Sequence, residues 1–233
     1  MGASVDVVIP IFNEVATVAE LHRRLVAACP GARLIFVDNG STDGTLDVVE
    51  GLQGTTVVRH QENLGYGQSL LDGIAAGTGE AIVMIDADLE YHPEDVPKLL
   101  AALSASPAVY GSRFLEKPAG PLMPLARRVG NAVVTRLFNA LFHQELTDLY
   151  TGLRAVRRDR LPLADLASAG FELVLELAAR LAQAGVTIAE VPIGYTPRSQ
   201  GRSKMRHIPE FVKFARRLVE LRLTTSHAFN ARA

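Results

Sequence analysis

The chain has 233 residues, of which 48% are hydrophobic and 21% charged, and its net charge at neutral pH is −1. This composition is that of a globular protein, and the length suits one large α/β domain with a full core. The single cysteine, Cys29, excludes an internal disulfide bond and is expected to be a small buried hydrophobic residue.

The sequence predicts neither a secretion signal nor a membrane span. Asp6 interrupts the first apolar run, and no basic segment precedes it. No apolar stretch approaches the roughly 18–20 residues that a membrane span needs. We therefore expect a cytoplasmic protein, or one bound peripherally to the cytosolic face of a membrane.

The charges are distributed unevenly along the chain. Residues 1–110 include 5 basic and 15 acidic residues (net −10), and residues 111–233 include 19 and 10 (net +9). An acidic half suits a metal ion, and a basic half suits phosphate groups or an anionic membrane, although two solvated faces would explain the pattern too. Nucleic-acid binding is disfavoured, because the basic half lacks interleaved aromatic residues and the acidic half would repel phosphates.

Apolar runs rich in β-branched residues alternate with helical segments in the first half. The predicted strands are Val5–Ile9, Leu34–Val37, Thr56–Arg59, Ala81–Ile85 and Val109–Ser112. The predicted helices are Glu14–Ala28, Thr45–Leu52, Tyr66–Ala76 and Pro93–Leu103. This alternation predicts a largely parallel sheet with helices on both faces, in which ligands bind beyond the carboxyl ends of the strands.

The second half is less regular. Its predicted helices are Leu122–Phe142, Phe171–Ala184 and Ile208–Leu223, and its predicted strands are Thr151–Val156 and Thr187–Ile193. No repeat, linker or low-complexity segment divides the chain, so we predict a single domain over residues 1–233. The segment Ile208–Leu223 is amphipathic with basic residues nearby, and it either lies on an anionic membrane or packs against the domain.

Polar residues follow the first two predicted strands. In VVIPIFNE (7–14), Asn13 and Glu14 stand where they can cap the next helix. In VDNGSTDGT (37–45), Asp38 and Asn39 can hydrogen-bond a base or a ribose, although a plain turn explains the same residues equally well.

Glycines open the third predicted helix. In ENLGYGQS (62–69), Gly65 and Gly67 permit close approach of a ligand to the backbone. The chain contains no GxGxxG fingerprint and no GxxxxGK[ST] loop, so neither dinucleotide-dependent hydride transfer nor P-loop ATP chemistry is indicated.

Two aspartates, Asp86 and Asp88, follow the fourth predicted strand in AIVMIDADLE (81–90). At the end of a buried strand, both carboxylates can converge on a hard divalent cation and a bound phosphate. An Asx turn after the strand is the alternative explanation of the same spacing.

These four segments, in this order, resemble family 2 glycosyltransferases of the GT-A fold, and within them the polyprenyl- or dolichyl-phosphate mannose and glucose synthases. The family pattern is VxIPxYNE, VDDGSxDGT, NxGxGxA and a DxD box. The resemblance continues through GSRF (111–114), RRVGNAV (127–133), TDLYTGLRA (147–155), EVPIGY (190–195) and RSQGRSK (198–204). It implies a Rossmann-like GT-A domain with a nucleotide-sugar and metal half (1–110), an acceptor half (111–206) and a C-terminal amphipathic helix (207–223).

The resemblance implies a nucleotide-diphosphate sugar, a GDP- or UDP-hexose, and a Mg²⁺ or Mn²⁺ ion. Asp86 and Asp88 would hold the ion, and Glu90 could supply a third oxygen. The positions that match the nucleotide contacts are Pro10, Phe12, Glu14, Asp38, Asn39 and Gly65. Phe12 replaces a frequent Tyr, and Asn39 replaces the second Asp of the family's pair, which leaves the base undetermined.

The basic half matches positions that hold phosphate in the same synthases. Arg113 and Arg128 (or Arg127) match those that bind the acceptor phosphate, for which the planar guanidinium is suited. Arg198, Arg202, Ser203 and Lys204 match a loop that closes over the donor phosphates. A membrane-anchoring partner or direct membrane contact is a further expectation.

The mechanism expected from the resemblance is one in-line displacement at the anomeric carbon with inversion. A phosphate monoester with a second pKa near about 6 is mostly anionic at neutral pH and needs little activation by a base. Asp148 is the acidic position in TDLYTGLRA that could act as a base, an arginine partner or a cap, with structural support favoured. The alternatives are a family 2 transferase for a soluble hydroxyl acceptor and a nucleotide-sugar-binding module without turnover.

Overall fold

The computed structural model describes residues 3–116, 123–197 and 207–224, without the side chains of residues 126, 207–213 and 215. A seven-stranded sheet has the order β3-β2-β1-β4-β6-β5-β7. The strands are β1 Val5–Ile11, β2 Arg33–Asn39, β3 Thr55–His60, β4 Ala81–Met84, β5 Ala108–Ser112, β6 Arg154–Arg157 and β7 Ile188–Pro192. Only β6 runs antiparallel to its neighbours β4 and β5 within this described sheet. The largely parallel α/β sheet predicted from the sequence is confirmed.

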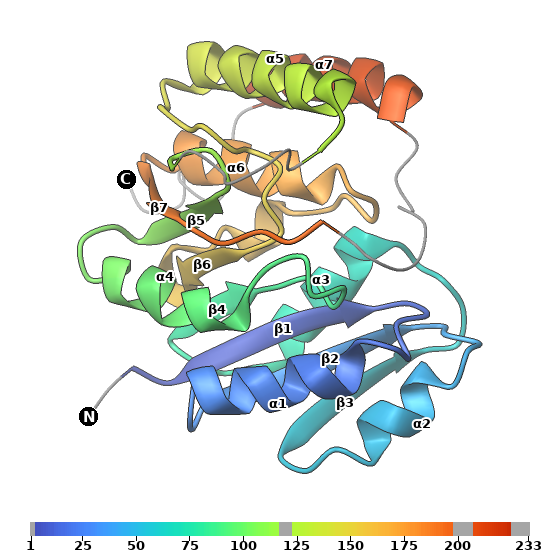
Figure 1. Ribbon diagram of the computed structural model, residues 1–233. Helices are drawn as coiled ribbons and strands as arrows, with labels where there is room; N and C mark the ends of the chain where they lie inside the picture. The colour runs from blue at the N-terminus through green and yellow to red at the C-terminus, as the bar shows by residue number, and fades with distance from the viewer. Residues whose placement is uncertain (1–2, 117–122, 198–206, 225–233) are drawn as a thin grey trace.

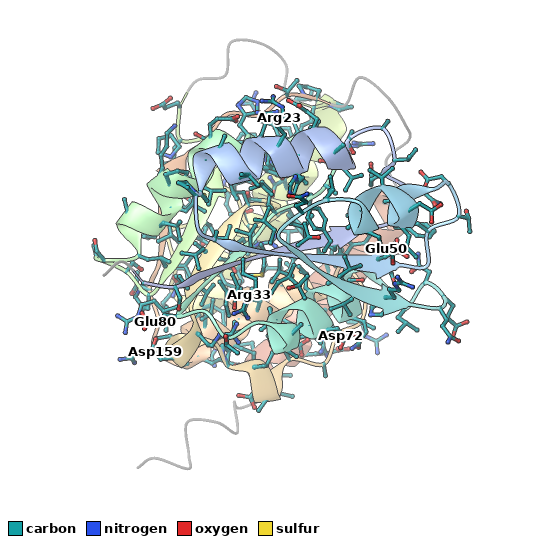
Figure 2. All side chains as sticks on the ribbon, turned by 90° about the horizontal axis from the view of Figure 1, so that it is seen from below. Arg23, Arg33, Glu50, Asp72, Glu80 and Asp159 are labelled. Atoms are coloured by element: carbon teal, nitrogen blue, oxygen red, sulfur yellow. The ribbon has the colours of Figure 1, made fainter. Side chains whose placement is uncertain are left out.

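Helices cover both faces of the sheet. They are α1 Val18–Ala28, α2 Thr45–Glu50, α3 Tyr66–Ala76, α4 Val96–Ala102, α5 Leu125–Phe142, α6 Leu173–Gln183 and α7 His207–Leu223, with 3₁₀ turns at Pro93–Asp95, Arg158–Arg160 and Leu163–Asp165. Seen from below, α1 with Arg23 and α3 with Asp72 lie on opposite sides of the strands (Figure 2). At the other end of the molecule, α5 and α7 lie side by side as an outer layer above α6 (Figure 1).

The strands are buried on both faces, which explains their continuous apolar runs. In β1, Val7 and Ile9 pack into a core with α1 and α4, whereas Val8 points into the opposite core with α3, α5 and α6. Such burial on two faces is typical of parallel strands and separates the molecule into two apolar layers around one sheet.

The start of α1 differs from the prediction. The helix begins at Val18 rather than at Glu14, and β1 continues through Pro10 to Ile11. Asn13 is not a helix cap, because its Oδ1 accepts a hydrogen bond from the Thr42 backbone N–H (2.8 Å) and its φ is +55°. The segment between β1 and α1 is therefore held by the neighbouring 41–45 loop instead of continuing the helix.

The amphipathic helix α7 packs against the domain. Its described apolar side chains Phe214, Leu218 and Leu221 are buried in the same core as α5 and α6, whereas Val219 is exposed. Among the residues described, no helix is both long enough and apolar enough to cross a membrane.

Candidate active site

A cavity of about 600 Å³ opens beyond the carboxyl ends of β1, β2 and β4. Parallel α/β sheets bind ligands beyond the carboxyl ends of their strands, and the volume of this cavity suits a small organic molecule. The sequence-predicted residues that line it are Pro10, Phe12, Glu14, Asn39, Gly65, Asp86, Asp88, Glu90 and Arg113. Asp38, Arg128 and Asp148 are not part of the lining.

The two aspartates lie on the cavity wall just after β4. Asp86 Oδ1 accepts a hydrogen bond from the Tyr66 hydroxyl (2.8 Å). Burial, and next the negative charge of Asp88, raise the pKa of the Asp86 carboxyl to about 7. Asp88 Oδ1 accepts from the Glu90 backbone N–H (3.0 Å), so the Asx turn considered from the sequence is also present.

The chemistry of these carboxylates fits a hard divalent cation. A cation between Asp86 and Asp88 would offset the free-energy cost of burying the charged Asp86 carboxylate. It would also offset the repulsion between the two carboxylates. No group of three or more His, Cys, Asp or Glu side chains forms a metal cluster in the described parts of the chain. Glu90 lines the same cavity, and its Oε2 accepts a hydrogen bond from the Tyr195 hydroxyl (2.9 Å). The residues present therefore fit such an ion: Asp86 and Asp88 would supply carboxylate oxygens, and substrate oxygens and water would complete the coordination.

Asp38 and Asn39 end β2 and face different environments. Asp38 Oδ2 accepts from the Ser41 backbone N–H (3.2 Å), and its buried Oδ1 has no hydrogen-bond partner among the described residues. Asn39 Oδ1 accepts from the Leu64 backbone N–H (2.8 Å) and contacts a ring nitrogen of His60 (3.1 Å). Asn39 reaches the cavity, so it is the member of the pair that a ligand in the cavity can contact.

Gly65 has a second role besides lining the cavity. Its φ of +103° is a conformation that side-chain-bearing residues rarely adopt, and a Cβ there would collide with the Ala169 carbonyl oxygen. The glycine therefore admits the 168–170 backbone against the start of α3, whereas the sequence suggested only approach by a ligand.

Arg113 and Asp148 form a buried pair at the end of β5. Arg113 Nε and Nη2 donate to the two Asp148 oxygens (2.6 and 2.8 Å), and Asn131 Nδ2 donates to Oδ1 as well (3.1 Å). These contacts fit the interpretation of Asp148 as an arginine partner. On α5, Arg127 lines the cavity, whereas Arg128 is exposed with its guanidinium 6.0 Å from the Phe114 ring centre.

The sequence reasoning missed Arg154 and Tyr66. Arg154 on β6 is buried and lines the cavity, its guanidinium lies 5.5 Å from the centre of the Tyr110 ring, and its Nε and Nη1 have no hydrogen-bond partner within the described structure. A charged residue directly between the apolar Leu153 and Ala155 was the available signal. The predicted residues Arg198, Arg202, Ser203 and Lys204 lie outside the described residues.

A family model, Glycosyl transferase family 2, matches residues 6–161 of the chain. The low-salt glycan biosynthesis hexosyltransferase Agl6 of Haloferax volcanii is 29% identical over 216 residues, which are 90% of this chain but 52% of that protein. The chain thus spans about half the length of this relative. The undecaprenyl-phosphate mannosyltransferase of Micrococcus luteus is 30% identical over 210 residues, covering 85% of this chain and 86% of that protein.

Among solved structures, the glucosyl-3-phosphoglycerate synthase of Mycobacterium tuberculosis in complex with Mn²⁺, UDP and glucosyl-3-phosphoglycerate superposes with a TM-score of 0.67. The sequence identity is 25%, and the match covers 95% of this chain and 79% of that one. The fold described above is therefore the GT-A fold of glycosyltransferases.

Proposed function

Because the chain belongs to glycosyl transferase family 2, we propose that it transfers a hexose, mannose or glucose, from GDP- or UDP-hexose to a polyprenyl phosphate with inversion. The observation that carries this proposal is one cavity lined by both acidic and basic residues. Asp86 and Asp88 lie in its lining together with Arg113, Arg127 and Arg154. Such a cavity suits two phosphate-bearing substrates, one held through a cation and one held by arginines.

Asp86 and Asp88 would hold Mg²⁺ or Mn²⁺ against the donor diphosphate. A bound divalent cation acts as a Lewis acid on the leaving group and as a template for its orientation. Tyr66 fixes the direction of the Asp86 carboxylate through the hydroxyl hydrogen bond described above. Phe12 and Glu14, which follow β1, and Asn39, which ends β2, line the same cavity and would contact the nucleotide of the donor.

Arg113 would bind the acceptor phosphate. Its Nε and Nη2 are directed at Asp148, which holds the guanidinium plane in place from inside the protein. Arg127 lines the same cavity and offers further donors. An acceptor phosphate oxygen then attacks the anomeric carbon as the bond from that carbon to the diphosphate oxygen breaks, and no proton has to be removed.

The outer face of α5 supports an acceptor carried by a membrane. Leu125, Val129 and Val133 recur every fourth residue and are 75%, 53% and 57% exposed. The same helix contributes Arg127 and Asn131 to the cavity lining. A helix with an exposed apolar stripe on one side and cavity-lining residues on the other would let the protein bind peripherally at the cytosolic face of a membrane while the phosphate of the lipid reaches Arg113.

A soluble hydroxyl acceptor, which can carry a phosphate elsewhere in the molecule, is the second candidate. It is supported by the likeness to a synthase solved with glucosyl-3-phosphoglycerate, since a phosphate bound by arginines can belong to a small acid as well as to a lipid. Nucleotide-sugar binding without turnover is the third, and the retained aspartates and buried arginines argue against it.

A transfer assay separates these functions. The intact protein is incubated with GDP- or UDP-mannose or -glucose, Mg²⁺ or Mn²⁺, and either a short polyprenyl phosphate in vesicles or 3-phosphoglycerate. We expect hexosyl polyprenyl phosphate with inverted anomeric configuration, loss of product with EDTA, and co-sedimentation with vesicles that falls in a Leu125→Ser, Val129→Ser, Val133→Ser variant. Transfer to 3-phosphoglycerate alone would favour the second candidate, and nucleotide binding with no product the third.

A further inference from the structure

A continuous series of contacts joins Asp86, on the cavity wall, to the helix α7. We propose that Tyr66 is a positioning residue for Asp86, and that Arg217 of α7 holds Tyr66 in place through Glu176 and the 167–171 segment. This inference rests on the proposed metal-dependent transfer, and it names residues that tune the metal site without coordinating the ion.

The series begins at the metal-binding carboxylate. The Tyr66 hydroxyl donates to Asp86 Oδ1 at 2.8 Å, so it sets the direction of the carboxylate. On its other side Asp86 Oδ2 is closely approached by Gly152, where a Cβ would collide with it. A partner that orients a ligand carboxylate affects metal affinity even though it does not coordinate the ion.

The Tyr66 ring is held in turn by the segment that leads into α6. Tyr66 stacks on Phe171, with ring centres 4.8 Å apart and planes 18° apart. Gln68 N–H donates to the Ala169 carbonyl (3.0 Å), and Gly65 and Gly67 leave the space that the 168–170 backbone fills. The 167–171 segment therefore packs directly against the first turn of α3, which contains Tyr66.

Glu176 ties this segment to α7. Its Oε2 accepts from the backbone N–H groups of Ala167 (3.1 Å) and Ser168 (2.8 Å), and its Oε1 accepts from Arg217 Nη2 (3.1 Å). The Glu176 side chain is 2% exposed and that of Arg217 is 32% exposed. A buried carboxylate adds little net stability compared with an apolar side chain, so its contacts serve to fix one position of the segment.

The order of these contacts predicts the order of effects. Removing the Tyr66 hydroxyl acts directly on Asp86. Removing the Arg217 guanidinium takes away the donor to Glu176 Oε1. Glu176 then holds the 167–171 segment less firmly, and Tyr66 is affected only through that segment. Since both changes reach Asp86 through the same hydroxyl, their effects on metal binding should not add.

The test is Mn²⁺ binding by the intact protein in the presence of saturating UDP or, in parallel, GDP, followed as the loss of the free Mn²⁺ electron paramagnetic resonance signal. We expect Tyr66→Phe to weaken Mn²⁺ binding about 10- to 100-fold, the range for losing a group that orients a metal ligand. Arg217→Met should weaken it by a smaller factor, Arg217→Lys should restore part of the loss, and the Tyr66→Phe, Arg217→Met double variant should match Tyr66→Phe alone.

Arg216→Met is the matched control. Arg216 is the neighbouring residue on α7, lies exposed and pairs with Glu220 (2.8 Å), so its loss should leave Mn²⁺ binding unchanged. Thermal unfolding checks that Arg217→Met is folded at the assay temperature, and Tyr66→Phe carries the test if it is not.

The outcomes distinguish this inference from the proposed function. Wild-type affinity in Tyr66→Phe, while the wild type binds Mn²⁺ and transfers hexose, overturns the inference and leaves the function intact. Additive losses in the double variant overturn the route through Tyr66. A wild-type protein that binds no Mn²⁺ with either nucleotide overturns both.

Discussion

Asp148 has no solvent-exposed surface and places both carboxylate oxygens on neighbours within the protein. Arg113 takes both oxygens and Asn131 shares one, while the Asp148 backbone N–H donates to Glu190 Oε1 (2.9 Å). Burial raises the pKa of Glu190, with hydrogen bonds from Thr147 opposing the shift. A carboxylate enclosed in this way suits the orientation of an arginine better than removal of a proton from a substrate in the cavity.

Asp148→Asn tests that role. The substitution keeps the shape but leaves the buried Arg113 guanidinium without its charged partner, so the free energy of unfolding should fall by about 3–5 kcal/mol. The KM for the acceptor phosphate should rise more than kcat falls. Urea unfolding and acceptor-dependent kinetics measure the two effects.

Asp159→Asn is the control for this substitution. Asp159 makes an exposed pair with Arg157, and such pairs contribute little to stability. If Asp148→Asn abolished turnover while folding and donor binding persisted, Asp148 would act as a base and the mechanism proposed above would be wrong.

Among single residues, those that belong to short sequence motifs were predicted, whereas those defined by a tertiary contact were missed. Asp86, Asp88 and Arg113 belong to short ordered motifs, and the structure brings them to one cavity. Tyr66 has its functional contact 20 positions away in the sequence, and the Arg154 guanidinium lies on a ring from another strand. Such partners meet only when the sheet forms, so sequence spacing could not predict them. Glu90, expected as a third metal ligand, lines the same cavity, and its contact with Tyr195 joins residues 105 positions apart.

At the scale of single elements, α3 shows how closely a helix packs on this sheet. It begins at Tyr66 and ends at Ala76, as predicted from the sequence. Gly73 faces β1 and β2, where a Cβ would collide with Val8 Cγ1 and come within 2.9 Å of Val37 Cγ2. The glycine is therefore a packing requirement and not a flexible position.

Gly73→Ala should be destabilising. In an exposed helix the change would gain roughly 1 kcal/mol, but here overpacking against two β-branched side chains should lower the free energy of unfolding by about 1–3 kcal/mol. Gly51→Ala is the control, because a Cβ there meets nothing closer than 3.4 Å. Urea unfolding of both variants decides the matter, and a Gly73→Ala protein as stable as wild type would contradict the described packing.

The helix boundaries that differ from prediction have a tertiary cause. The segment before α1 carries good capping residues, yet Glu14 N–H donates to Thr45 Oγ1 (2.9 Å) and Val15 N–H to Asp43 Oδ2 (3.2 Å). Contacts with a loop about 30 residues away therefore delay the helix to Val18. Local signals predict that a helix exists more reliably than where it begins.

At the scale of the whole molecule, a buried ion pair joins the first strand to the segment after β6. Asp6 Oδ2 accepts from Arg158 Nη2 (2.9 Å) and from the Gly79 backbone N–H, and the Asp6 side chain is 2% exposed. Arg158 also donates to the Gly79 and Ile74 carbonyls (2.6 and 3.1 Å). The pair lies at the amino-terminal end of β1, whereas the cavity lies at the carboxyl end of this strand.

Arg158→Met should destabilise the fold by about 3 kcal/mol, because Asp6 would stay buried with its main charged partner removed. Transfer activity at a temperature where the protein is folded should be unchanged, since the change is remote from the cavity. Arg157→Met, which removes an exposed pair with Asp159, should shift stability by less than about 0.5 kcal/mol. Equal unfolding curves for the two variants would contradict the expected contribution of the Asp6–Arg158 pair to the free energy of unfolding.

The sequence by itself determined the class of fold, the family and the place of the two aspartates at the end of a buried strand. These follow from periodicity and from motifs whose members lie within a few residues of one another, so they do not depend on how distant segments meet. Only the tertiary structure decided the antiparallel entry of β6, the pairing of Arg113 with Asp148 and the contacts from Arg217 to Asp86. Each of these features joins residues from separate elements. A buried charged side chain meets its partner only when those elements pack together, so the sequence alone does not specify the pair.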